Sequence, residues 1–146
     1  MSAPIVPVLS SSVMGPLGIM HLPRLWLKIL LHACGRLPQG YRHGVGGFDE
    51  FVTTTLGVER DAFIAYIETA KPAYLTLESW IRANAATLTP EAIATINARI
   101  GAANLPEPML AERTARFALG DPSYTRAVAL NDLDDWAAMH EALTSA

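Results

Sequence analysis

The stretch PRLWLKILLHAC, residues 23–34, decides the fold class of this chain. Pro23 suits the first turn of a helix, where its missing N–H donor is not needed. Gly35 follows directly and is a natural helix stop. The apolar side chains between them recur at the spacing of one helical face: Trp26, Ile29, Leu30 and Ala33. The stretch therefore predicts an amphipathic helix.

The same spacing continues along the chain. It predicts helices over about 48–56, 61–70, 73–84, 90–101 and 106–119, and Thr89-Pro90-Glu91 is a good N-terminal signature for the fourth of these. Asn131 or Asp132 can cap a last helix. Its core-facing stripe is expected to be Leu133, Trp136, His140 and Leu143. No stretch alternates with period two, so we expect an all-α protein, a compact irregular bundle of about five to seven short helices.

Length and composition favour one domain. The chain has 146 residues, of which 51% are hydrophobic and 17% charged, enough apolar surface to form a core. Residues 1–20 carry no charged side chain and contain Pro4, Pro7 and Pro16. They have neither the basic start of a secretion signal nor the unbroken apolar run of a membrane span. We expect an extended or disordered apolar tail over 1–20, a single helical domain over 21–146, and no membrane partner.

Charge and cysteine content narrow the function classes. The chain has 11 basic and 14 acidic side chains, a formal net charge of −3, which argues against nucleic-acid binding. Cys34 is the one cysteine, so the chain can form neither an internal disulfide nor a thiolate metal cluster. A lone thiol fits the cytoplasm. The usual role of such a residue is a small buried apolar side chain on a helix.

One segment concentrates chemistry-bearing residues, HACGRLPQGYRHGVGGFD over residues 32–49. Five glycines and one proline within 35–47 exclude regular structure, so a Gly-rich loop is expected after the first helix. The segment holds two histidines, two arginines, a tyrosine and an acid. Free backbone amides at a helix start near Phe48 would favour an anion.

From this segment we expect a small enzyme or ligand-binding protein, without a cofactor, that acts on a small anionic metabolite by acid/base chemistry. The class would be a lyase, an isomerase or a hydrolase. His43 would be the acid or base, Asp49 would orient it, and Tyr41 would donate a hydrogen bond. The predicted substrate-binding residues are Arg36, Arg42, His32, Gly46 and Gly47.

Other interpretations stay open. The loop residues would be purely structural if they only cap helices or face solvent. The chain would be a non-catalytic helical interaction module, in a homodimer, if its apolar tail covers a partner. A metal held by His32, His43 and Asp49 is a minority alternative, and we expect none. The glycines match neither the dinucleotide fingerprint nor a P-loop.

The stretch LPRLWLKILLHACGRLPQGYRHGVGGFDEF, followed by RDAFIAYIETAKP and the tryptophan of ESW, resembles a family of small bacterial proteins known as domain of unknown function 5069. The resemblance covers roughly residues 22–80. It implies a bacterial origin and a common site that comprises His32, Arg36, Tyr41, His43 and Asp49. It implies no particular reaction.

Overall fold

A computed structural model of the protein describes residues 2–145, and within them all regular structure is helical. The seven helices confirm the predicted all-α bundle. Their bounds are α1 Leu22–Ala33, α2 Gly47–Leu56, α3 Arg60–Ala70, α4 Tyr74–Asn84, α5 Pro90–Ala102, α6 Met109–Arg116 and α7 Ala127–Thr144. A loop with four glycines joins α1 to α2.

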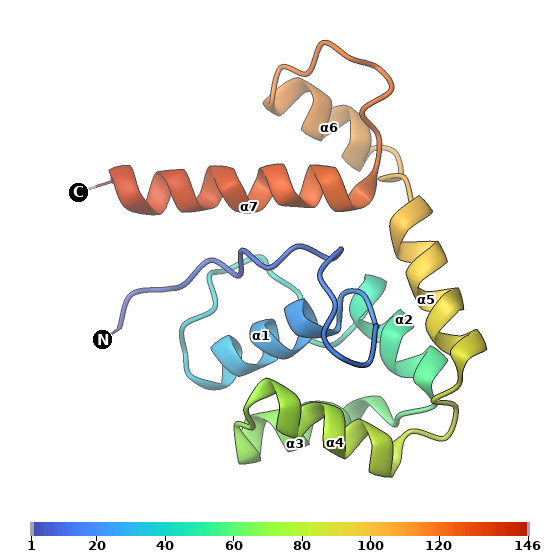
Figure 1. Cartoon of the computed structure of the whole chain (residues 1–146). Helices are drawn as coiled ribbons and strands as arrows, with labels where there is room; N and C mark the ends of the chain where they lie inside the picture. Colours follow the sequence, from blue (N-terminus) through green and yellow to red (C-terminus); the bar gives the residue numbers. More distant parts are fainter. Residues whose placement is uncertain (1, 146) are drawn as a thin grey trace.

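The main core surrounds α1, which lies above α3 and α4 with α2 and α5 at one side (Figure 1). The inner face of α1 is fully buried at Leu22, Leu25 and Ile29. Isoleucines of α3, α4 and α5 meet it: Ile67, Ile81, Ile96 and Ile100. The period of apolar residues therefore encoded this part of the fold.

Helix ends follow the expected capping chemistry. Thr89 Oγ1 accepts the N–H of Ala92 at 3.1 Å, which starts α5 at Pro90 as its sequence signature predicts. Gly57 adopts a left-handed conformation, with φ of 67°, and ends α2. These caps keep the connections short, and α2 packs against both α1 and α5.

The start of α7 packs on a second, smaller cluster made by Leu105, Ala127 and Leu130. Of the predicted core stripe of this helix, Leu133 packs against this cluster, but the prediction is wrong farther along the helix. Trp136 is 58% exposed and Leu143 is 77% exposed, and α7 begins at Ala127, before the predicted caps. The reason is electrostatic: a carboxylate of α7, Asp135, points into the molecule to pair with a buried arginine, which turns the neighbouring Trp136 outward.

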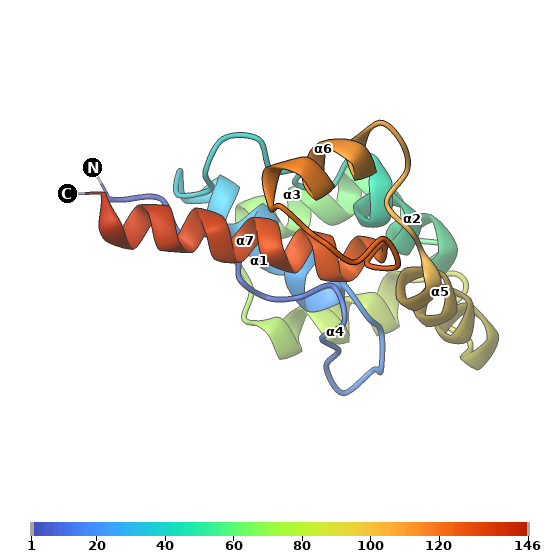
Figure 2. The ribbon, with the colours of Figure 1, turned by 90° about the horizontal axis from the view of Figure 1, so that it is seen from above.

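The first twenty residues belong to the same domain. Residues 2–20 are mostly extended and run between α1 and α7 (Figure 1), where Val6 and Ile19 are buried. The Arg24 guanidinium donates to the carbonyls of Pro7 and Leu9 at 2.6 and 2.8 Å. The N-terminal segment is thus tied down by a buried charge, and both ends of the chain lie at one side of the molecule (Figure 2).

Two further observations concern the chain as a whole. Cys34 is exposed rather than buried, because it caps the C-terminus of α1, where the helix leaves the core. Among the described residues, no helix combines the length and apolar character that crossing a bilayer requires.

Candidate functional site

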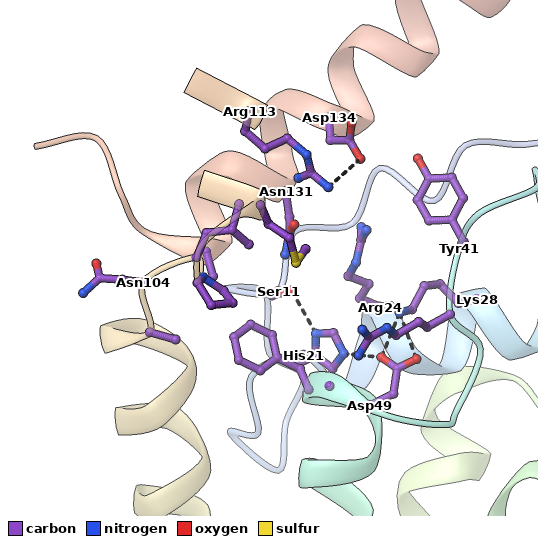
Figure 3. A pocket seen from close by; sticks show the side chains of 18 of the residues that line it. Ser11, His21, Arg24, Lys28, Tyr41, Asp49, Asn104, Arg113, Asn131 and Asp134 are labelled. Carbon is purple, nitrogen blue, oxygen red and sulfur yellow. Dashed lines mark hydrogen bonds and ion pairs between the residues drawn. The ribbon is translucent and has the colours of Figure 1, made fainter. Parts of the chain in front are cut away.

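The structure divides the predicted site residues into two groups. Tyr41, Arg42, Gly47 and Asp49 line a pocket of about 530 Å3, and the others do not. This pocket lies between the body formed by α1 and α2 and the unit formed by the end of α5 with α6 and α7 (Figure 3). Only part of the predicted segment therefore faces this pocket.

Arg36, His32 and His43, which were also predicted as site residues, contact other parts of the protein outside the pocket. Arg36 Nε donates to the carbonyl of Ala3 at 3.0 Å and so holds the N-terminal segment. The rings of His32 and His43 stack, with centroids 3.7 Å apart and planes 16° apart. Neither ring lines the pocket, and among the described residues no three potential ligands are grouped to hold a metal.

Asp49 is the centre of a buried polar cluster, with 2% of its surface exposed. Its Oδ1 accepts from His21 Nε2 at 2.6 Å and from Lys28 Nζ at 2.8 Å. Its Oδ2 accepts from Lys28 Nζ and from the N–H of Gly44, both at 2.9 Å. Asp49 thus contacts His21 and Lys28 in place of the predicted partner, His43.

These contacts set the charge state of Asp49. Burial by itself would raise its pKa, but the hydrogen bond from His21 and the positive charge of Lys28 outweigh burial and lower the pKa to about 2. Burial lowers the pKa of Lys28, opposed by the charge of Asp49. The carboxylate is therefore ionised at neutral pH and sits against a buried ammonium group.

His21 connects Asp49 to a serine. Burial is the largest influence on His21 and lowers its pKa below 6.5, so the ring is neutral at neutral pH. Since the ionised Asp49 can only accept, Nε2 carries the proton, and Nδ1 accepts from Ser11 Oγ–H at 2.9 Å. The backbone of His21 is left-handed, with φ of 72°, a strained conformation that often marks functional positions.

A second buried pair closes the pocket near α7. Arg24 Nη1 lies 2.5 Å from Asp135 Oδ2, and Tyr41 Oη donates to Asp135 Oδ1 at 3.0 Å. Burial and the charge of Asp135 raise the pKa of Tyr41, so its hydroxyl stays a donor. The Tyr41 hydroxyl donates its hydrogen bond to Asp135, so its predicted role as a donor to a ligand stays a prediction.

The pocket wall carries more positive than negative side chains. Its cationic residues are Arg24, Lys28, Arg42, Arg99 and Arg113, and its carboxylates are Asp49 and Asp134. Within the described residues, Arg42 and Arg99 have no carboxylate within 4 Å. The buried Nη1 of Arg113 has no hydrogen-bond partner there either. This wall suits an anionic group.

Several residues of the cluster escaped the analysis of the sequence. His21, Arg24 and Lys28 follow one another at helical spacing beside the apolar face of α1. Arg24 and Lys28 lie on a helix that is otherwise largely apolar, and a buried charge needs a partner of opposite charge. The sequence could therefore have predicted a buried ion pair at this helix. Ser11 gave no such signal, since nothing in its own segment indicates that a histidine contacts it.

No model of a known protein family matches this chain, and no curated protein is significantly similar to it. The resemblance of residues 22–80 to the domain of unknown function 5069 family therefore stays a prediction.

Proposed function

We propose that the protein binds a small anionic metabolite in the pocket between α1, α2 and α7 and carries out acid/base chemistry on it without a cofactor. The observation that carries this proposal is a pocket of about 530 Å3 in which, among the described residues, Arg42 and Arg99 pair with no carboxylate and the buried Nη1 of Arg113 has no hydrogen-bond partner. The net charge of the whole chain is −3. Small-molecule sites usually have volumes of about 300–1,000 Å3.

The anion would bind to arginines that still have free donors. Among the described residues, Arg42 has no carboxylate within 4 Å, and Arg113, although it pairs with Glu112 and Asp134, has an unbonded Nη1, so both have donors left for a carboxylate or phosphate. A guanidinium group can grip either anion with two parallel hydrogen bonds. Arg24 and Lys28 contribute less, because Asp135 and Asp49 already neutralise them.

In this proposal the acid or base is His21, which lines the pocket, rather than the predicted His43, which does not. A neutral histidine with a pKa below 6.5 can take up a proton at neutral pH. Asp49 holds the ring in one tautomer and stabilises the charge that appears when Nδ1 is protonated. The left-handed backbone of His21 aims its side chain at this cluster at a cost in conformational energy.

Thermal melting against a panel of carboxylates and phosphates tests the proposal. A ligand at about 100 times its dissociation constant stabilises by about 2.7 kcal/mol, which raises Tm by roughly 5 to 10 °C in a domain of this size. Arg113→Gln should reduce the shift, whereas Arg82→Gln, an exposed arginine of α4 outside the pocket, should retain it. No shift from any anion would contradict the proposal.

A second candidate is the homodimeric interaction module, and one observation favours it. Trp136 and Leu143 are exposed seven residues apart on α7, so they share one face of that helix. A contiguous exposed apolar patch, which two such residues on one helix face would help to form, is typical of an interaction surface. Light scattering distinguishes the two: a dimer that Trp136→Ser converts to monomer supports the module, and a wild-type monomer counts against it.

A further inference from the structure

Three buried side chains form a chain of hydrogen bonds at the wall of the pocket (Figure 3). Ser11 Oγ lies 2.9 Å from His21 Nδ1, and His21 Nε2 lies 2.6 Å from Asp49 Oδ1. All three residues line the pocket. A hydroxyl, an imidazole and a carboxylate in this order are the groups that make a serine nucleophilic.

We propose that Ser11 is a nucleophile that His21 activates, and that the pocket hydrolyses a small carboxylic ester that carries a second, anionic group. This inference rests on the proposed anion site, because the arginines would hold the anionic group while the ester carbonyl meets Ser11. Nδ1 of His21 faces Ser11 and Nε2 faces Asp49. Either ring nitrogen can take up the serine proton while the other donates to the carboxylate, so this orientation permits the proton transfer.

The N-terminal segment is built to hold Ser11 still. On one side, the Pro7 and Leu9 carbonyls accept from the Arg24 guanidinium. Next to Ser11, the hydroxyl of Ser10 donates to Asp132 Oδ2 at 3.2 Å, which ties the segment to α7. A nucleophile has to be positioned to a fraction of an ångström, and these contacts from α1 and α7 supply that restraint.

The reaction balances without another reagent than water. Ser11 Oγ forms a bond to the ester carbonyl carbon while its proton passes to His21 Nδ1. The bond from that carbon to the alcohol oxygen then breaks, and the alcohol leaves with the proton from Nδ1. Water repeats the sequence on the acyl-serine, which releases the acid and restores Ser11.

In this proposal the side-chain amide of Asn131 would donate to the carbonyl oxygen, which becomes negative during the attack. The Asn131 side chain lines the same pocket and makes no hydrogen bond to another described residue. A side-chain amide aimed at such an oxygen stabilises its charge. Asn131 lies one turn before Asp134 on α7, and Asp134 pairs with Arg113 of α6 at 3.8 Å. The proposed hydrogen-bond donor to the carbonyl oxygen is therefore near the arginine that would bind the anionic group.

A fluorophosphonate probe tests Ser11 directly, because it forms a covalent bond only with activated hydroxyls. We expect intact mass spectrometry of the full chain to show one adduct and peptide mapping to place it on Ser11. Ser11→Ala should abolish the adduct. Ser12→Ala is the matched control, since Ser12 is exposed and lies outside the pocket, and it should label like the wild type.

A second variant separates activation from folding. His21→Asn retains a side chain that tolerates the left-handed backbone but cannot act as a base, and it should label at least about 100-fold more slowly. The melting curve of each variant shows whether it is folded. As an independent readout in the wild-type protein, the labelling rate should fall on acidification as His21 becomes protonated next to Asp49, Lys28 and Arg24.

The outcomes are decisive for each proposal separately. An adduct on Ser11 that needs His21 supports the nucleophile. A folded wild-type protein that gives no adduct with excess probe, or an adduct that survives Ser11→Ala, overturns it. Anion-induced stabilisation without labelling would leave the binding pocket standing and remove the ester chemistry. Labelling without any anion effect would support the activated serine and contradict the proposed anion site.

Discussion

Replacing Asp49 with asparagine probes the cluster on which the proposed chemistry depends. The change removes one negative charge and keeps the size of the side chain. Lys28 would then lose the two carboxylate contacts at 2.8 and 2.9 Å, while its side chain stays only 7% exposed. We expect a large loss of stability, because a buried ammonium group without a counter-ion has lost both its hydration and its partner.

The magnitude follows from the contacts. Removing one partner of a buried ion pair costs about 3–5 kcal/mol. Asparagine accepts through a single oxygen, so it cannot also satisfy His21, Lys28 and the N–H of Gly44 as the carboxylate does. For a domain of this size, a loss of about 4 kcal/mol lowers Tm by roughly 8 to 16 °C.

Urea denaturation followed by circular dichroism measures this free energy, together with a thermal melt. Glu50→Gln is the matched control, since Glu50 is the next residue but its side chain is 39% exposed, so the change should affect stability far less. Combining Asp49→Asn with Lys28→Met should recover part of the loss, because the stranded charge is removed as well. A melting temperature for Asp49→Asn within about 2 °C of the wild type would refute this reasoning.

Three further changes give measurable results. On acidification, the unfolding free energy measured by urea denaturation should fall first below pH 6.5, because burial lowers the pKa of His21 and the unfolded chain binds its proton more readily. It should fall further, by about 2 kcal/mol, between about pH 4 and pH 2, as Asp49 loses its charge. A pH-independent value would contradict this. Arg24→Met should destabilise the protein by about 3–5 kcal/mol, because the contacts of Arg24 to Asp135 and to the carbonyls of Pro7 and Leu9 are lost. Limited proteolysis followed by mass spectrometry should then show faster cleavage within residues 2–20. Cleavage at the wild-type rate would contradict the role of Arg24 in holding this segment. Leu77→Ala should cost about 2–5 kcal/mol in urea denaturation, since the side chain is fully buried, while the 63% exposed Leu75→Ala should change little, and equal effects would contradict the assigned core.

Much of the fold was predictable because its signal is local. The period of apolar residues located the helices, and Thr89 with Pro90 marked the start of α5. The prediction that Trp136 and Leu143 of α7 face the core was wrong. Periodicity identifies a helical face but does not say which face turns inward, and the buried Arg24 drew Asp135 inward, which leaves Trp136 exposed.

The candidate site was predictable only in part. Tyr41 and Arg42 of the Gly-rich loop and Asp49 of α2 do line one pocket, whereas His43 stacks on His32 outside it. Neighbouring residues on a loop point in different directions, so a shared segment does not imply a shared site. Composition could identify the loop as unusual but could not select which of its side chains converge.

The sequence by itself determined the helical class, the approximate helix positions and the Gly-rich loop before α2, because each depends on residues close together in the chain. Only the tertiary structure decided what surrounds Asp49. His21 and Lys28 lie 28 and 21 residues away, and Asp135 lies 111 residues from Arg24. A buried charge needs an opposite charge within a few ångströms, and which residue supplies it depends on how the helices pack rather than on any local pattern.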